Sequence, residues 1–215
     1  MNDIERNHYS VFITKDEMNA LPTEKFEGKI IVVSSEHTAE KAIEDLRKAS
    51  VVGFDTETKP NFKKGKMNNV ALMQLSTDSK CYLIRLSKIG FVKCVKDFLE
   101  DETILKVGLS IKDDFLNLSK LSKFTPGGFV DLQEYTREFR IKDLALTKIH
   151  SILFDRRISK GQQLSNWEAS TLNEKQKAYA ALDAVACVNI YNHLKEGKFI
   201  PEESKYFRPE SNPEP

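Results

Sequence analysis

Hydrophobic and polar positions follow two different periods along this chain. Short runs rich in Val, Ile and Leu predict β-strands at 29–33, 51–58, 70–75, 81–84, 104–108 and 129–132. Apolar residues at helical spacing predict helices at 35–49, 91–99, 111–121 and 173–194, and the pattern is helical in general after residue 131. The strands at 51–58, 70–75 and 81–84 are joined by short links, which favours an antiparallel meander. Strands mixed with helices predict an α/β fold.

The ends of the chain lack these periods. Residues 1–28 are expected to form an arm or irregular segment, and 29–200 to form one domain. The segment 201–215 carries Pro209, Pro213 and Pro215 among charged residues and is expected to be a disordered tail.

Composition narrows the functional classes. The chain has 215 residues, of which 40% are hydrophobic and 30% are charged, as is usual for one globular domain. The net charge is only +1, so any nucleic-acid surface must be a local basic patch. Three cysteines without a CxxC pair indicate reduced thiols, not a zinc site or a disulfide framework. With no signal peptide or apolar run of about 18 residues, we expect an intracellular protein, cytoplasmic or nuclear.

The stretch 51–58 carries the first candidate chemistry. Its apolar residues run into Asp55 and Glu57, which share one face of a strand because alternate side chains point the same way. Two carboxylates on a core strand repel each other and lose hydration, and a divalent cation would relieve both costs. The alternative is a strand end whose acids are simply hydrated.

A second acidic position follows the strand predicted at 104–108. Asp113 and Asp114 fall in the first turn of the next helix, where acids also complement the helix dipole. Asp114 shares the inward stripe with Leu118 and Leu121, so Asp114 is the functional candidate of the two.

The last helix carries the third candidate. Residues 179–187 are apolar nearly all round, yet Asp183 sits among them, with Tyr179 one turn earlier on the same face. A buried carboxylate must be paired, hydrogen-bonded or metal-bound. Taken alone, a Tyr–Asp pair is more often a structural hydrogen bond. Together with Asp55, Glu57 and Asp114, it matches the requirements of two-metal phosphoryl transfer, with Mg²⁺ or Mn²⁺ on oxygen ligands.

These motifs resemble those of the DEDD 3′–5′ exonucleases. The resemblance rests on Phe-Asp-Thr-Glu at 54–57, on Gly108 with Asp114 six residues later, and on Tyr179-x-x-x-Asp183. It implies a ribonuclease H-like mixed sheet flanked by helices, two divalent cations, and catalytic roles for Asp55, Glu57, Asp114, Tyr179 and Asp183. Ala178 stands where a histidine subclass would have its histidine, so Tyr179 indicates the tyrosine subclass.

Further segments resemble Werner-type exonuclease domains within that family. These are Gly65-Lys66, Val70-Ala71-Leu72-x-Gln74-Leu75, Lys80-Cys81-Tyr82-Leu83 and Ser165-Asn166-Trp167. The resemblance implies hydrolysis from a free 3′ end, with DNA favoured over RNA. A ribonuclease D-like exoribonuclease and a catalytically silent nucleic-acid-binding module are the alternatives.

Basic residues near these motifs are candidates for substrate binding. Lys63, Lys64 and Lys66 follow the carboxylate strand and are predicted to hold the phosphate backbone, although a charge run is more commonly a solvated loop. Arg156, Arg157 and Lys160 are similar candidates. Trp167 is expected to be a core anchor.

Overall fold

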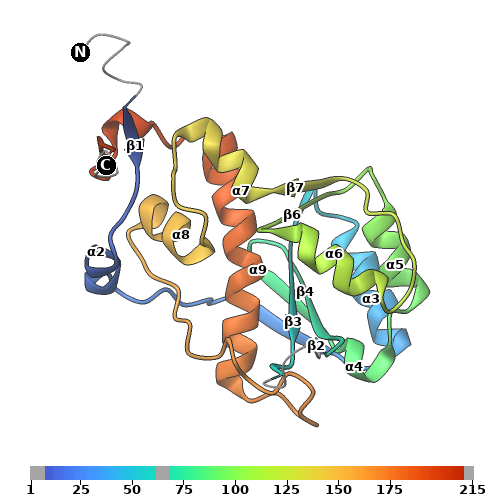
Figure 1. The fold of residues 1–215 in the computed structure, drawn as a ribbon. Coiled ribbons are helices and arrows are strands. Elements are labelled where there is room, and N and C mark those ends of the chain that lie inside the picture. Colours follow the sequence, from blue (N-terminus) through green and yellow to red (C-terminus); the bar gives the residue numbers. More distant parts are fainter. Residues whose placement is uncertain (1–7, 62–67, 211–215) are drawn as a thin grey trace.

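The computed structural model describes residues 8–61 and 68–210 of the chain. At its centre is a six-stranded sheet with strand order β2-β5-β4-β3-β6-β7 (Figure 1). The strands are β2 (Lys29–Val33), β3 (Val51–Thr58), β4 (Val70–Ser76), β5 (Lys80–Ile84), β6 (Leu105–Gly108) and β7 (Phe129–Asp131).

The sheet is mixed. Strand β4 pairs antiparallel with both β3 and β5, which confirms the predicted meander. Strands β2, β6 and β7 are added through parallel pairings β2–β5, β3–β6 and β6–β7. Parallel neighbours need crossover connections, and helices supply several of them.

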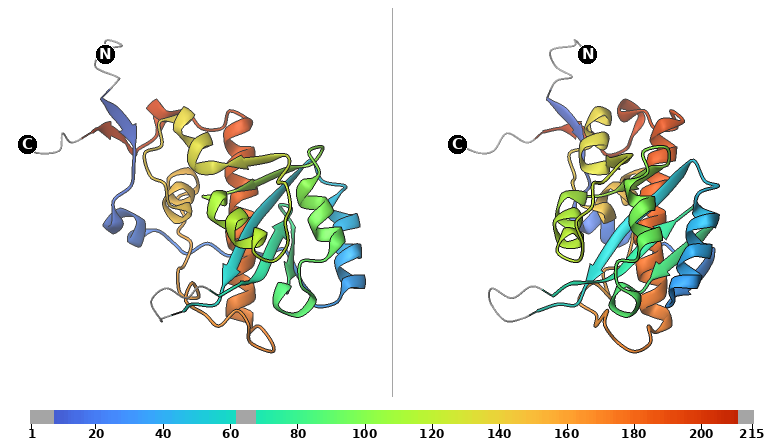
Figure 2. Two further views of the ribbon diagram at one scale, coloured as in Figure 1. Left: turned by 45° about the vertical axis from the view of Figure 1, so that its right-hand side comes forward. Right: turned by 90° about the vertical axis from the view of Figure 1, so that its right-hand side faces the viewer.

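Helices cover both faces of the sheet. They are α3 (Glu36–Leu46), α4 (Leu86–Ile89), α5 (Lys93–Glu100), α6 (Ile111–Ser119), α7 (Leu132–Tyr135), α8 (Leu146–Phe154) and α9 (Glu174–Lys195). One core cluster joins α3, α5 and α6 to the side of β3 that carries Val52 and Phe54. Two further clusters pack α9 against the sheet, and two more views show α9 running the length of the molecule beside it (Figure 2).

The predicted helices are confirmed, with shifted ends. Ser35 caps α3 as expected, but the helix ends at Leu46, three residues before the predicted end at residue 49. The expectation of general helix after residue 131 is wrong for 155–173, which contain no helix among the described residues. Helix α4 was not foreseen, because four residues are too few to show a period.

Both ends of the chain contain short regular elements that were not expected. Strand β1 (Tyr9–Val11) and helix α2 (Lys15–Ala20) lie in the segment expected to be irregular. The short 3₁₀ helix Pro201–Glu203 and strand β8 (Phe207–Pro209) lie in the expected tail. Strands β1 and β8 pair with each other in a separate antiparallel sheet. Strands of three residues are too short to show a period, and the sequence does not reveal that these two, far apart in the chain, pair with each other.

A membrane-spanning helix must be both long and apolar. Among the residues that the structure describes, no helix is both long enough and apolar enough to cross a membrane.

Helix α9 and strand β3 touch through their backbones. A Cβ added to Gly53 would lie 2.0 Å from the carbonyl oxygen of Ala184 and 2.9 Å from a side-chain carbon of Val188. No side chain fits at this position. Glycine is therefore required here for close approach, not for an unusual backbone angle.

We expect Gly53→Ala to lower the free energy of unfolding by about 1–3 kcal/mol, because the helix must move away from the sheet. Gly161→Ala is the matched control, since its Cβ would meet only the Ser159 hydroxyl, at 3.5 Å. Urea unfolding followed by circular dichroism measures both. Equal stability of the two variants would contradict the close contact.

Candidate active site

Strand β3 presents two carboxylates to helix α9. Gly53, Asp55 and Glu57 alternate with Val52 and Phe54, which point into the opposite core. Asp183 on α9 completes the group. One carboxylate oxygen from each of the three acids lies within 4.8 Å of the other two. The structure thus brings together three of the four predicted acids.

Helix α9 is built to lie against this strand. Asn173 caps it in a reciprocal hydrogen-bonded arrangement with Gln176. Its buried face is rich in small side chains, including Ala180, Ala181 and Ala184. Small residues let the helix approach the sheet closely, which explains why Asp183 reaches the carboxylates of β3.

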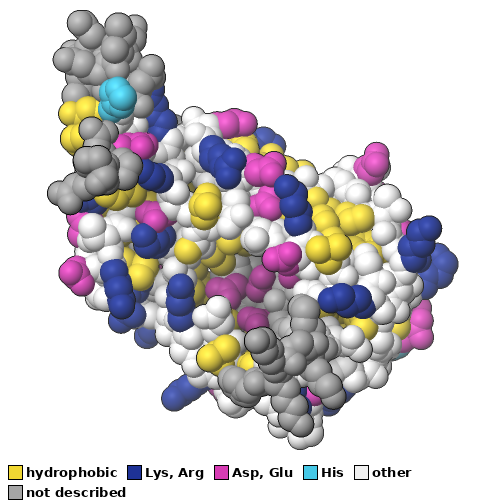
Figure 3. Space-filling view, in the orientation of Figure 1, with side chains coloured by type: hydrophobic (Ala, Val, Ile, Leu, Met, Phe, Trp, Pro, Cys, Tyr) yellow, Lys and Arg dark blue, Asp and Glu magenta, His cyan; other side chains and the backbone are white. Residues whose placement is uncertain are grey.

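The three acids line a cavity of about 320 Å³. Acidic side chains gather in a hollow near the middle of the face drawn in Figure 3, with lysine and arginine side chains around it. The lining residues are Asp55, Thr56, Glu57, Leu109, Ala145, Leu146, Thr147, Lys160, Gln163, Tyr179, Asp183 and Cys187.

The carboxylates destabilise one another's charged forms. Burial, followed by the charges of Asp183, Asp114 and Glu57, raises the pKa of Asp55 well above its ordinary value. Burial and the charges of Asp183 and Asp114 raise the pKa of Glu57 to about 9. For Asp183, burial raises the pKa to about 7, although a hydrogen bond from Tyr179 and the charge of Lys160 act in the opposite direction. Such a cluster is suited to a cation.

Asp114 lies beside this group and outside the set of three. The Thr56 hydroxyl donates a hydrogen bond to its Oδ1, on the face of β3 opposite to Asp55. Burial raises the pKa of Asp114 to about 6. Asp113 is exposed, as the helical period predicted.

The turn before Asp114 is fixed by a neighbouring strand. Ser110 has a φ of 60° and leads from β6 into α6. The carboxylate of Asp131, at the end of β7, accepts hydrogen bonds from the backbone N–H groups of Ser110 and Ile111 at 2.9 and 3.2 Å. It thereby satisfies donors at the start of α6 and holds the helix that carries Asp114.

Tyr179 stands at the border of the acidic cavity. Burial and the charges of Asp183 and Glu57 raise the pKa of its hydroxyl, so the group stays protonated. Its ring lies 6.1 Å from that of Trp167, measured between centroids. Trp167 is fully buried, which confirms its expected role as a core anchor.

Sequence reasoning missed Gln74. It faces Asp55 across the β3–β4 pairing, and its amide Nε2 donates a hydrogen bond to Asp55 Oδ2 at 3.4 Å. The side chain is fully buried, so the amide restrains the Asp55 carboxylate. Only the register between the two strands reveals this pairing, and the periodicity of either strand alone does not fix that register.

The predicted basic residues have different outcomes. Lys160 lines the acidic cavity. Arg157 bonds instead to the Leu21 carbonyl oxygen, and Arg156 is near Glu24. Lys63, Lys64 and Lys66 lie outside the described residues, so their role stays a prediction.

A sequence model described as 3′–5′ exonuclease matches residues 30–197. The chain belongs to the 3′–5′ exonuclease family. It is 32% identical over 185 residues to the bifunctional 3′–5′ exonuclease/ATP-dependent helicase WRN of Mus musculus, covering 81% of this chain and 13% of that protein. It is 28% identical over 192 residues to a 3′–5′ exonuclease of Arabidopsis thaliana, covering 81% of this chain and 66% of that protein. The exonuclease chain therefore spans only part of either relative.

Solved structures share the fold of this exonuclease. The EXO domain of Aedes aegypti Nibbler has a TM-score of 0.72 at 21% identity, covering 84% of this chain and 97% of that one. Escherichia coli RNase D has a TM-score of 0.68 at 19% identity, covering 78% and 44% respectively. The mixed six-stranded sheet flanked by helices is thus the predicted ribonuclease H-like fold.

Without metal, the stability of the exonuclease should fall as pH rises from about 5 to 9. The folded-state pKa values of Asp114, Asp183 and Glu57 are about 6, 7 and 9, above their ordinary values of 3.8, 3.8 and 4.5. The folded state therefore binds more protons than the unfolded state in this window, and raising the pH removes that advantage. Thermal melting in chelator across the pH range measures the slope.

Asp55→Asn is the companion variant. It removes one buried acid from the group, and with it the free-energy cost of desolvation and repulsion, so it should melt higher than the wild type in chelator at pH 8 and gain little from Mn²⁺. A variant that melts lower in chelator, yet gains as much from Mn²⁺ as the wild type, would show that the acids do not form one site.

Proposed function

We propose that this exonuclease removes 5′-nucleotides one at a time from the 3′ end of a nucleic-acid strand, with DNA favoured, using two divalent cations, Mg²⁺ or Mn²⁺. The observation that carries the proposal is the convergence of Asp55, Glu57 and Asp183 with the Tyr179 hydroxyl at one cavity.

The carboxylates are the residues that would hold the cations. Asp55, Glu57 and Asp183 offer oxygen atoms close together, and hard cations such as Mg²⁺ and Mn²⁺ prefer oxygen ligands. Asp114 would contribute from the side, since its charge already acts on Asp55 and Glu57. Bound there, the two cations would activate the attacking water and neutralise charge on the leaving oxygen.

Tyr179 would position the water. Its hydroxyl stays protonated and donates its proton to Asp183, so the oxygen is held at the edge of the acidic group and its lone pairs can accept a hydrogen bond from the water. With this role for Tyr179, the chain would belong to the tyrosine subclass.

Lys160 would hold the substrate phosphate. It is the lysine that lines the cavity among the described residues, and its charge acts on Asp183. Lys63, Lys64 and Lys66 would bind further phosphates of the nucleic-acid strand. DNA is favoured because of the resemblance to Werner-type domains. Hydrolysis of RNA would instead indicate a ribonuclease D-like exoribonuclease, and binding without cleavage would indicate a catalytically silent module.

Digestion of 5′-labelled DNA and RNA strands of matched sequence tests the activity. In Mg²⁺ or Mn²⁺, the DNA should shorten stepwise from the 3′ end, and chelator should abolish the reaction. Internal cuts, or activity that survives chelation, would contradict the mechanism. Faster loss of the RNA strand would indicate a ribonuclease D-like enzyme.

We expect Tyr179→Phe to lower kcat by about 10²-fold, because the water loses a positioning hydroxyl. Stabilisation by Mn²⁺ should persist in this variant, whereas Asp183→Asn should lose both activity and that stabilisation. Single-turnover cleavage and thermal melting measure the two effects. Full activity in Tyr179→Phe would show that the tyrosine hydroxyl has no role in the reaction and that the residue is structural.

A further inference from the structure

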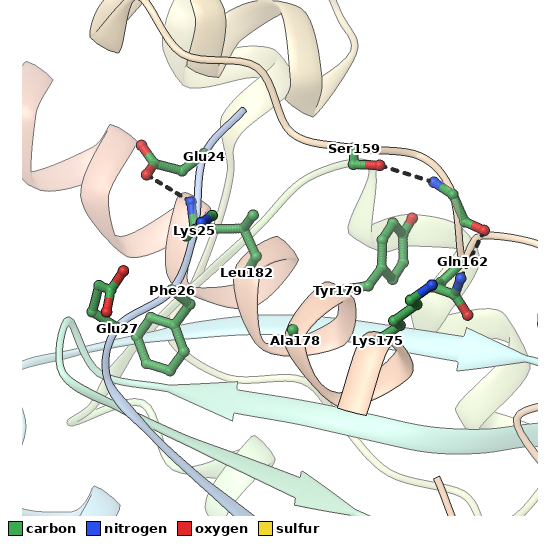
Figure 4. A pocket seen from close by; sticks show the side chains of 11 residues that line it. Glu24, Lys25, Phe26, Glu27, Ser159, Gln162, Lys175, Ala178, Tyr179 and Leu182 are labelled. Carbon is green, nitrogen blue, oxygen red and sulfur yellow. Dashed lines mark hydrogen bonds between the residues drawn. The ribbon is translucent and has the colours of Figure 1, made fainter. Parts of the chain in front are cut away.

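A second cavity lies on the other side of Tyr179 from the acids. Its volume is about 390 Å³, slightly larger than the acidic cavity. Figure 4 shows it between the segment with Lys25 and Phe26 and the loop with Ser159 and Gln162, with α9 beneath. The lining residues are Glu24, Lys25, Phe26, Glu27, Ser159, Gly161, Gln162, Lys175, Ala178, Tyr179 and Leu182.

The two cavities are neighbours. Tyr179 lines both of them. The loop before Trp167 also divides them, because Ser159 and Gln162 line the second cavity while Lys160 and Gln163 line the acidic one. A molecule in the second cavity would therefore contact the same tyrosine that borders the proposed reaction centre.

The surface of this cavity has an apolar interior and a charged rim. Phe26 packs against the apolar cluster that contains Leu182, and Ala178 and the Tyr179 ring extend that surface along the helix. The amines of Lys25 and Lys175 stand at the rim, and no ion pair within the described parts of the chain engages either of them.

The acids at the rim offset the charge of these amines only in part. Glu24 is directed to other groups: its carboxylate lies 3.8 Å from His150 and 4.0 Å from Arg156, and it accepts a bond from the Lys25 backbone N–H. Only Glu27 adds an acidic side chain without such partners among the described residues.

The loop wall is already braced. The Ser159 hydroxyl accepts a hydrogen bond from the Gly161 backbone N–H at 3.4 Å. The Gln162 side chain bonds to the Gly161 carbonyl oxygen at 3.0 Å and to the Ser165 hydroxyl at 2.9 Å. A cavity with fixed walls needs little ordering when a ligand enters, which favours binding.

We propose that this cavity binds a nucleobase of the substrate strand, from a nucleotide next to the scissile phosphate. A base is flat and apolar on its faces, so it stacks on Tyr179 and Phe26 irrespective of its identity. Lys175 and Lys25 then meet the adjoining phosphates. The inference rests on the proposed function and adds a binding site to it.

The test uses DNA strands that lack one base. Three 5′-labelled oligothymidylates are compared in Mn²⁺: one intact, one with an abasic terminal nucleotide and one with an abasic penultimate nucleotide. The enzymes are wild type, Ala178→Trp and Ala178→Leu, with Ala20→Trp as a control because Ala20 is also exposed on a helix. KM and kcat are measured for the first cleavage.

Ala178→Trp should fill the cavity and raise KM on the intact strand roughly tenfold or more, with kcat nearly unchanged, as expected for loss of one stacked base. In the wild type, one of the two abasic strands should raise KM by a similar factor, and that strand identifies the bound base. On that strand, Ala178→Trp and wild type should have equal KM. Ala20→Trp should match wild type on all strands.

Two results would overturn the inference. One is an unchanged KM for Ala178→Trp on the intact strand, and the other is the same increase on all three strands. If thermal melting shows that Ala178→Trp is unfolded, Ala178→Leu takes its place with a smaller increase. A wild-type enzyme that cleaves no strand would instead contradict the proposed function, so the two failures are distinguishable.

Discussion

The close contact between helix α9 and strand β3 is the constraint on which the site depends. Gly53 leaves room for the carbonyl oxygen of Ala184, so the two backbones meet directly. One residue away from this contact on the helix is Asp183, and two residues away on the strand is Asp55. Any side chain at position 53 would separate the elements and pull the carboxylates apart. The site is therefore specified by a missing side chain as much as by the acids themselves.

The acidic cavity lowers the stability of the folded state. Buried carboxylates of like charge lose hydration and repel each other, as the raised pKa values of Asp55 and Glu57 show. The neighbouring clusters of buried apolar side chains, above all the one beneath α3 and α5, supply the opposing stabilisation. The same repulsion that costs the fold stability would give a divalent cation its affinity.

The sequence was informative wherever a local period applies. Alternation along the strand placed Asp55 and Glu57 on one face, and the helical period separated Asp114 from exposed Asp113. Features that depend on register or on distant pairing were hidden. Gln74 opposite Asp55 is one, and the hydrogen bond that turns Asp114 toward Thr56 is another. The cavity beyond Tyr179 is formed by segments that are far apart in the sequence, so no single stretch of the chain predicts it.

The pairing of β1 with β8 ties distant parts of the chain into one cooperative unit. Val11 and Tyr206 are buried in the same core cluster as Ile190 of α9, and Arg208 bridges back to Glu17 across 2.8 Å. Fraying of either strand would expose apolar surface beside the other. Hydrogen exchange in the two strands should therefore occur through a shared opening, and that opening would also loosen the later turns of the helix that carries Asp183.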